Sequence, residues 1–303
     1  MVIGPTLVLW AANGIESAWQ KAKSLYTKTN PPSVVLHCWP GPGATKVANE
    51  LRAINPGVNI WFGCGVDGIA RRLLNGSQNE DACIREMLTI ARGVKLTGAL
   101  GLYWNAEAAY KASGDDRTKI EAMVKRGLAK VKELYPDVRQ MHTAYDGPSH
   151  VNGWGGHGDY CWSAWLGSDS PIECSIPQVY WAAGGVKGID RYNLHKLSWK
   201  AAQDAGRISK QMPTIPFLQI HGCDGHDIVR VALESNGAFL WASPSRVDEK
   251  GKEALGVLCW LFRKGLWSKE AIKTFQSQNS LTSDGIVGPK TYAALVEQSQ
   301  KPQ

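Results

Sequence analysis

The chain lacks several features that would place it in a familiar class at once. Its seven cysteines, among 303 residues, include no C-x-x-C pair. This spacing gives neither a disulfide framework nor a zinc ribbon, so we expect reduced thiols. No apolar run approaches the roughly 20 residues that a membrane-spanning helix requires, so we expect no stable membrane insertion. Basic residues never occur five in a row, which argues against a nucleic-acid partner although the net charge is +7.

The N-terminal segment lacks the basic start of a secretory signal. Residues 1–10 are apolar, but the run is short and contains Pro5, so we expect a first strand there and no cleaved leader. Phenylalanine is scarce, with 5 residues against 13 tryptophans. An indole ring with one N–H donor suits stacking on sugars or bases as well as core packing. The hydrophobic fraction of 44% and the charged fraction of 20% exclude disorder over most of the length.

Short β-rich runs alternate with longer amphipathic stretches over most of the chain. We expect strands at 6–11, 33–39, 59–64, 99–105, 139–145, 175–181, 215–220 and 237–241, and helices at 16–28, 44–54, 80–93, 119–134, 190–205, 227–234 and 249–263. This alternation, repeated eight times in about 260 residues, is typical of an α/β fold, the (β/α)8 TIM-like barrel. A doubly wound open sheet is the alternative if one strand is misplaced.

The last part of the chain departs from this rhythm. We expect helices at 269–275 and 290–297, joined by a turn at 283–289. In that turn Gly285 supplies positive φ, and Pro289 lies near the first turn of the second helix. We therefore divide the chain into a barrel, residues 1–265, and a small C-terminal α-helical module, residues 266–303.

The segment from Ala271 to Leu295 closely resembles the second half of the peptidoglycan-binding domain of bacterial and phage wall hydrolases. The family pattern is A-V-x-x-F-Q, then G-L-x-x-D-G-x-x-G-x-x-T-x-x-A-L. The matching residues, which the resemblance assigns to the wall-binding module, are Phe275, Gln276, Leu281, Asp284, Gly285, Gly288 and Thr291. The family has an earlier helix and a first copy of the turn, which this chain lacks. The module is therefore truncated, and residues 254–263 must serve both as the last barrel helix and as its first helix.

Chemistry in such a barrel lies at the carboxyl ends of the strands. On the expected fourth strand Tyr103, Asn105 and Glu107 share one face, which brings Glu107 to the rim, whereas Trp104 points away into the core. Glycoside cleavage needs one carboxyl group as proton donor and a second group to stabilise the oxocarbenium-like charge. Glu107 suits the first role; its alternative role is an ordinary glutamate at a helix N-terminus.

The fourth strand resembles the D-x-E ending of two barrel families that act on N-acetylated sugars, the family 25 lysozymes and the family 18 chitinases. Residues 141–147 loosely resemble the chitinase M-x-Y-D-x-x-G strand. The resemblance implies Glu107 as the acid, Asn105 and Asp146 as polar helpers, and Tyr145 and Tyr180 as the floor of the site. Position 105 is Asn where both families have Asp. Asp67 and Asp224 are alternatives to Asp146 as the second carboxylate, and each of the three also suits a turn or a helix cap.

Aromatic residues gather at strand ends and in a Gly/Trp-rich loop at 147–170. Glycan clefts use aromatic faces to stack sugar rings. We expect substrate contacts, besides the two tyrosines, from Trp39, Trp154, Trp162, Trp165 and Trp181.

Three other functions stay open. A zinc-dependent N-acetylmuramoyl-L-alanine amidase would act on the same polymer, but the available histidines (His142, His150, His157, His221 and His226) form no H-E-x-x-H motif. A Cys–His endopeptidase would use Cys38 or Cys223. A wall-binding barrel that has lost its activity is the third alternative, because Asn105 replaces an Asp.

Taken together, these patterns and resemblances predict a monomeric peptidoglycan hydrolase. It would cleave the β-1,4 glycan strand between N-acetylated amino sugars, without a metal or another cofactor. The net charge of +7 suits the anionic bacterial wall. The apparent lack of an export signal favours a bacteriophage endolysin, made in the host cytoplasm and released to the wall by a separate membrane-permeabilising protein of the holin type.

Overall fold

The computed structural model describes residues 4–10, 14–145, 147–154, 156–180, 188–219, 224–242 and 249–301. Their strands are β1 (Gly4–Trp10), β2 (Ser33–His37), β3 (Asn59–Gly65), β4 (Gly101–Asn105), β5 (Arg139–Thr143), β6 (Cys174–Ser175), β7 (Gln178–Val179), β8 (Phe217–Gln219) and β9 (Gly237–Ala242). All pair in parallel, in the order β6-β5-β4-β3-β2-β1-β9-β8-β7.

The ring closes because β6 and β7 are two parts of one extended segment. On one edge Ile176 N donates to His142 O at 2.7 Å, toward β5. On the other edge Phe217 N donates to Pro177 O at 2.9 Å, from β8. Pro177 has no N–H to continue the ladder, which explains why the segment is divided in two. The expectation of a TIM-like barrel is confirmed.

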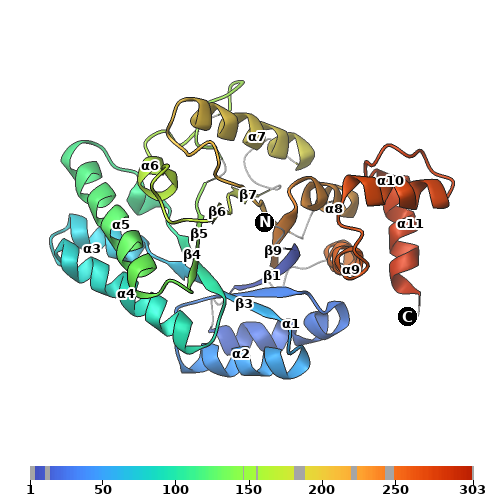
Figure 1. The fold of residues 1–303 in the computed structure, drawn as a ribbon, viewed down its shortest axis with the longest axis horizontal. Coiled ribbons are helices and arrows are strands. Elements are labelled where there is room, and N and C mark those ends of the chain that lie inside the picture. The colour runs from blue at the N-terminus through green and yellow to red at the C-terminus, as the bar shows by residue number, and fades with distance from the viewer. Residues whose placement is uncertain are drawn as a thin grey trace.

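Helices surround the strands, as Figure 1 shows. They are α1 (Ile15–Thr29), α2 (Pro42–Ile54), α3 (Asp67–Leu74), α4 (Glu80–Leu96), α5 (Gly114–Leu134), α6 (Trp162–Leu166), α7 (Gly188–Asp204), α8 (Gly225–Glu234) and α9 (Glu249–Arg263), with a short 3-10 helix, η1 (Ala108–Tyr110). The sequence reasoning did not predict α3, which follows β3 directly, or α6 within the Gly/Trp-rich loop.

The barrel has two apolar layers. Ten buried residues fill the ring itself: Val8, Val35, Trp61, Tyr103, Met141, Cys174, Ile176, Ile215, Phe217 and Phe239. A larger cluster lies between the strands and the helices and includes Trp104, whose Nε1 donates to Gln140 Oε1 at 3.1 Å. The predicted alternation along β4 is therefore correct: Tyr103 faces the inside of the ring and Trp104 the helices.

The C-terminal helices α10 (Lys269–Gln278) and α11 (Pro289–Gln300) lie outside the ring, drawn in red in Figure 1. Helix α9 contacts β1 and α1 on its barrel side and also packs against α11. The Tyr292 hydroxyl donates to Glu253 Oε1 at 3.0 Å, which joins α11 to α9. The last barrel helix thus also supports the module, in the dual role that the sequence predicts for residues 254–263.

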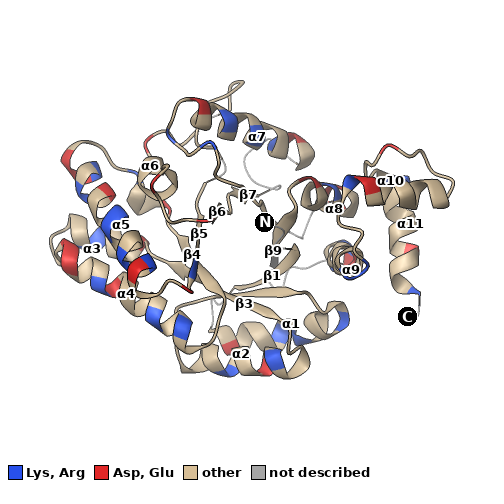
Figure 2. Ribbon diagram, in the orientation of Figure 1, with Lys and Arg blue, Asp and Glu red and all other residues tan. Residues whose placement is uncertain are grey.

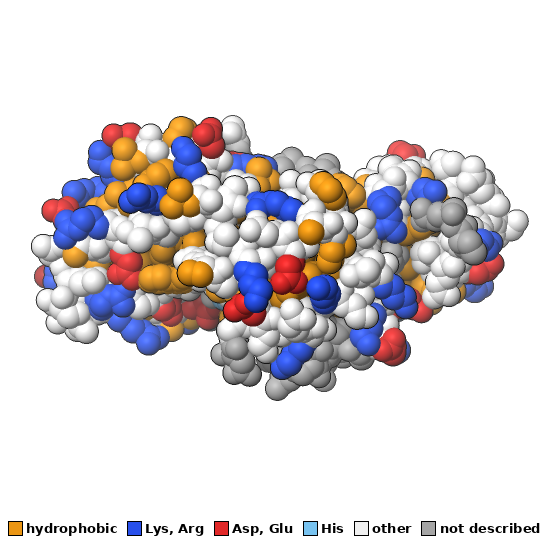
Figure 3. Space-filling model, turned by 90° about the horizontal axis from the view of Figure 1, so that it is seen from below, with side chains coloured by type: hydrophobic (Ala, Val, Ile, Leu, Met, Phe, Trp, Pro, Cys, Tyr) orange, Lys and Arg blue, Asp and Glu red, His pale blue; other side chains and the backbone are white. Residues whose placement is uncertain are grey.

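Charged residues lie mainly on the helices, as Figure 2 shows. Figure 3 gives the face seen from below Figure 1, where basic and acidic side chains are interspersed. The net charge of +7 is therefore not gathered into one basic patch on this face. None of the described helices is long and apolar enough to cross a membrane.

Candidate functional site

Glu107 lies just beyond β4, where the chain leaves the ring. Its side chain is half-buried, and Oε1 accepts a hydrogen bond of 2.7 Å from Gln178 Nε2. The same Gln178 nitrogen lies 3.3 Å from Asn105 Oδ1. The predicted common face of Asn105 and Glu107 is therefore present, and one amide group from β7 contacts both residues.

The backbone at Glu107 is fixed by Asp67, the first residue of α3. Asp67 Oδ1 accepts from Glu107 N at 2.7 Å, and Oδ2 accepts from Ala109 N at 3.4 Å. Asp67 therefore caps the N-terminus of η1 from a distant part of the chain, and its carboxylate accepts from backbone N–H groups that have no partner within the helix. Both of its oxygens have backbone partners, so the geometry favours a positioning role for Asp67 over that of second carboxylate.

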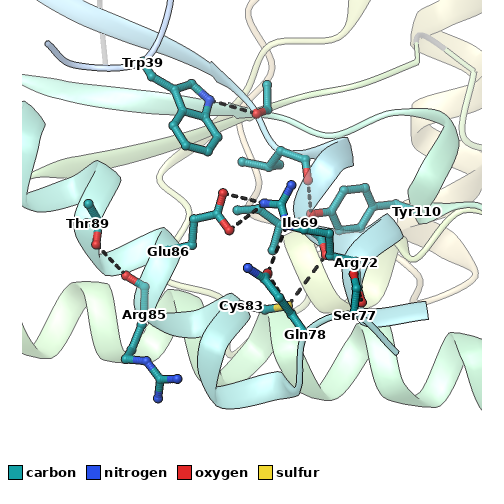
Figure 4. A network of polar contacts seen from close by, with 12 residues as sticks. Trp39, Ile69, Arg72, Ser77, Gln78, Cys83, Arg85, Glu86, Thr89 and Tyr110 are labelled. Atoms are coloured by element: carbon teal, nitrogen blue, oxygen red, sulfur yellow. Dashed lines mark hydrogen bonds and ion pairs between the residues drawn. The ribbon is translucent and has the colours of Figure 1, made fainter. Parts of the chain in front are cut away.

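The junction between β3 and α3, which precedes Asp67, is anchored from two sides, as Figure 4 shows. Trp39 Nε1 donates to Gly65 O at 3.1 Å, and the Tyr110 hydroxyl donates to Val66 O at 3.2 Å. In α3 behind the loop, Arg72 Nη2 donates to both carboxylate oxygens of Glu86 in α4. These contacts fix the position of Asp67, which in turn fixes the backbone of Glu107.

Trp39 is the most exposed of the predicted aromatic residues that the structure describes, with 46% of its surface accessible. It follows β2 by two residues, at the carboxyl end of the ring. An exposed indole fixed through its N–H is a suitable platform for a sugar ring. The prediction of a substrate contact at Trp39 is compatible with this placement.

Tyr145 and Tyr180 are both half-buried near the same rim. The Tyr145 ring contacts His157 with centroids 4.0 Å apart, and the ammonium of Lys111 lies 4.2 Å from its centroid. Burial and the nearby charges of Glu107 and Asp67 raise the pKa of Tyr145 to about 12. Tyr180 packs against Phe217 with centroids 6.1 Å apart.

The Gly/Trp-rich loop does not present all of its indoles to solvent. Trp162 and Trp165 are 1% and 0% exposed, so their expected role in sugar stacking is wrong for this conformation. Trp162 Nε1 donates to His157 O at 2.7 Å, and Trp165 packs 5.3 Å from Tyr110. Both lie on the buried face of α6, three residues apart, which is the spacing of a helix core. Trp154 is half-buried, and its backbone forms an isolated antiparallel β-bridge with Val151.

Two predicted site residues, Asp146 and Trp181, lie outside the described residues. The other candidate carboxylate, Asp224, is the N-cap residue of α8; its side chain is 64% exposed and lies 3.7 Å from Lys250. Gln178 lies in the middle of the sixth expected strand, two residues before Tyr180, and is not among the predicted site residues.

Among the described residues no group of three His, Cys, Asp or Glu side chains is placed to hold a metal ion. The six cysteines in that part of the chain are free thiols. His142, one of the histidines considered for a zinc site, is fully buried and pairs with the Tyr160 hydroxyl at 2.7 Å. Burial lowers the pKa of His142 to about 3, so it is neutral in the core.

In the module, the predicted wall-binding residues form an internal network centred on Gln276, which is 1% exposed. Its Nε2 lies 2.9 Å from Asp284 Oδ1, 3.0 Å from Ile286 O and 3.1 Å from Thr291 Oγ1, so its two hydrogens are shared among three acceptors. Its Oε1 accepts from Gly285 N at 2.8 Å. Gly285 has φ of +75°, as the turn requires.

The other matched residues also serve the fold of the module. Phe275 is 6% exposed and packs in the core, Leu281 N donates to Gln276 O, and Gly288 precedes the first turn of α11. The spacing between Gln276 and the D-G-x-x-G-x-x-T turn in the motif is explained by these hydrogen bonds, which hold the turn against α10. Contact between these residues and the wall stays a prediction.

Comparison with known proteins agrees with both parts of the chain. Residues 263–295 match a family of peptidoglycan binding domains. A family 18 chitinase from Cycas revoluta, solved with allosamidin, is 11% identical, with 84% of this chain and 99% of that chain covered at a TM-score of 0.59. A family 18 chitinase from Pseudoalteromonas aurantia is 12% identical, with 87% and 100% covered at a TM-score of 0.57. A chitinase from Rhizomucor miehei is 14% identical, with 84% and 98% covered at a TM-score of 0.51.

No curated protein sequence matches the chain. The expected peptidoglycan-binding segment is confirmed, and the resemblance of the barrel to family 18 chitinases is confirmed at the level of the fold.

Proposed function

We propose that the chain is a peptidoglycan hydrolase that cleaves the β-1,4 glycan strand between N-acetylated amino sugars. One observation carries the proposal: a rim glutamate, held by Gln178, stands on a chitinase-like barrel that is joined to a peptidoglycan-binding segment. The barrel offers a proton donor, and the segment selects the polymer. The net charge of +7 favours approach to an anionic wall.

Glu107 acts as the general acid. Gln178 occupies Oε1, whereas Oε2 has no hydrogen-bond partner among the described residues and is free to carry the proton. As Oε2 protonates the glycosidic oxygen, the bond from that oxygen to the anomeric carbon breaks and positive charge develops on the sugar. Asn105 cannot carry a negative charge, so the stabilising group is Asp146 or the acetamido oxygen of the substrate itself.

The biological setting that we propose is lysis of bacteria by a phage endolysin. The protein would act as a monomer and reach the wall after release from the host cytoplasm. Added to a suspension of bacterial walls, the purified chain should lower its turbidity.

The proposal is tested by digestion of purified peptidoglycan with the chain and with Glu107→Gln. We expect new reducing ends with the unmodified chain and a loss of at least 100-fold in rate with the variant, the usual size of a general-acid contribution. Glu133→Gln is the matched control, because Glu133 is an exposed glutamate of α5 whose one ion-pair partner among the described residues is Lys130. Freed peptides without reducing ends would show an amidase or peptidase, and an unchanged rate with Glu107→Gln would show that another group is the acid.

A further inference from the structure

A histidine that the proposed mechanism does not use lies directly below the rim glutamate. The β2–β3 register aligns Leu36 with Phe62, which brings His37 beside Gly63, and the β3–β4 register aligns Gly63 with Tyr103. Tyr103 precedes Asn105 by two residues on the same face of β4. His37, Gly63 and Tyr103 therefore form one level of the ring, immediately beneath Asn105 and Glu107.

This level is built around one hydrogen bond, 2.5 Å long, between His37 Nδ1 and the Tyr103 hydroxyl. The imidazole also stacks on Trp10, with centroids 4.0 Å apart and planes 14° from parallel. Gly63 leaves the space for the pair, since a Cβ there would lie 2.4 Å from the Tyr103 hydroxyl and 2.6 Å from His37 Nδ1. Three strands thus fix the plane of the imidazole.

The pair is neutral near neutral pH. Burial lowers the pKa of His37 to about 4 and raises the pKa of Tyr103 well above its ordinary value. Tyr103 is 0% exposed, and His37 Nδ1 is the one hydrogen-bond partner of its hydroxyl among the described residues. The phenol therefore donates its proton and Nδ1 accepts it, because the buried O–H would otherwise be left without an acceptor. In a neutral imidazole the other nitrogen, Nε2, must then carry the second proton.

His37 Nε2 has no hydrogen-bond partner among the described residues, and it is not one of the buried polar atoms that lack a partner. His37 is only half-buried. The structure therefore holds an oriented, uncharged N–H donor that solvent can reach, one level below the proposed acid.

We propose that His37 positions the substrate, with Nε2–H donating to a hydroxyl or acetamido oxygen of the sugar whose glycosidic oxygen Glu107 protonates. The inference rests on the proposed function and adds a specificity contact to it. Tyr103 acts through His37, because it fixes which nitrogen carries the proton.

The test compares two double variants that differ only in the donor, both in the Glu107→Gln chain. H37F/Y103F removes the donor and leaves no buried hydroxyl unpaired, whereas H37Q/Y103F places an amide N–H near the former position of Nε2. Affinity for the β-1,4-linked tetramer of N-acetylglucosamine is measured by calorimetry, and thermal unfolding reports whether each variant is folded. We expect three- to tenfold weaker binding for H37F/Y103F, the range of one neutral hydrogen bond, and recovery to within twofold for H37Q/Y103F.

Equal affinity of the two folded double variants would overturn the role of His37 and leave the proposed function standing. If the Glu107→Gln parent does not bind the tetramer at all, the inference is overturned, whereas the proposed function is decided separately by the release of reducing ends from peptidoglycan. An independent readout is the ¹⁵N spectrum of His37 at pH 7, where a proton on Nδ1 in place of Nε2 would also overturn it.

Discussion

Gln276 should decide whether the C-terminal module folds. Its NH2 group has two hydrogens for three nearby acceptors, and its carbonyl oxygen accepts one hydrogen bond, in a site that is 1% exposed. At about 1 kcal/mol for each of three net bonds, Gln276→Leu should destabilise the helix pair by about 3 kcal/mol, because the Gly285 N–H and the Ile286 carbonyl lose their partner. Opening of the pair should then become up to about 10²-fold more frequent.

The assay is amide hydrogen exchange over α10 and α11, combined with binding to purified walls. Exchange should rise in residues 269–300, and the bound fraction should fall. Gln278→Leu is the matched control, because it changes the same residue type at an exposed position of the same helix. If both variants exchange equally and bind walls equally, the network around Gln276 does not stabilise the module.

Three further predictions follow from other contacts. The neutral histidines His37 and His142 should make the fold acid-sensitive: their pKa values are lowered to about 4 and about 3, so stability is complete above 6.5 and falls as the unfolded state takes up protons below it. Each should cost about 2.5 kcal/mol at pH 4.5, and urea unfolding at pH 7.0 and 4.5 measures the difference; equal stability would contradict it. Trp39→Ala should weaken binding of the N-acetylglucosamine tetramer about tenfold, if 1–3 kcal/mol per stacked ring applies to sugars as to bases, and unchanged affinity would exclude a stacking role. Tyr292→Phe should cost about 1 kcal/mol in urea unfolding, because Glu253 loses its partner, and a value near zero would show that the bond is dispensable.

The sequence predicts the parts of this protein that depend on local pattern. The alternation on β4 correctly separates Trp104 from Asn105 and Glu107, and the D-G-x-x-G turn correctly places Gly285 at positive φ. Such features arise between neighbours in the chain, so periodicity and turn chemistry are enough to find them.

The parts that depend on ring closure were not predictable in this way. Gln178 reaches Glu107 over 71 positions of sequence, and His37 reaches Tyr103 over 66, because parallel strands two apart in the ring bring their inward faces together. Composition also could not show that Trp162 is buried, since an aromatic loop can turn its rings toward a cleft or toward the core.

Because α9 packs against both the barrel and α11, the module is held in a fixed position relative to the barrel. With α11 packed on a helix of the barrel, no slack connection lies between the two parts, so anchoring the module also fixes the position and angle of the rim relative to the anchor. A flexible tether would let the barrel sample many bonds from one anchoring point. If the barrel cleaves the wall as proposed, each anchoring event therefore offers only the few bonds at one fixed reach, and release from the wall has to precede access to new bonds. Helix α8 also contacts α11, so a recombination that joined a foreign module after α9 would have to rebuild the contacts with both barrel helices.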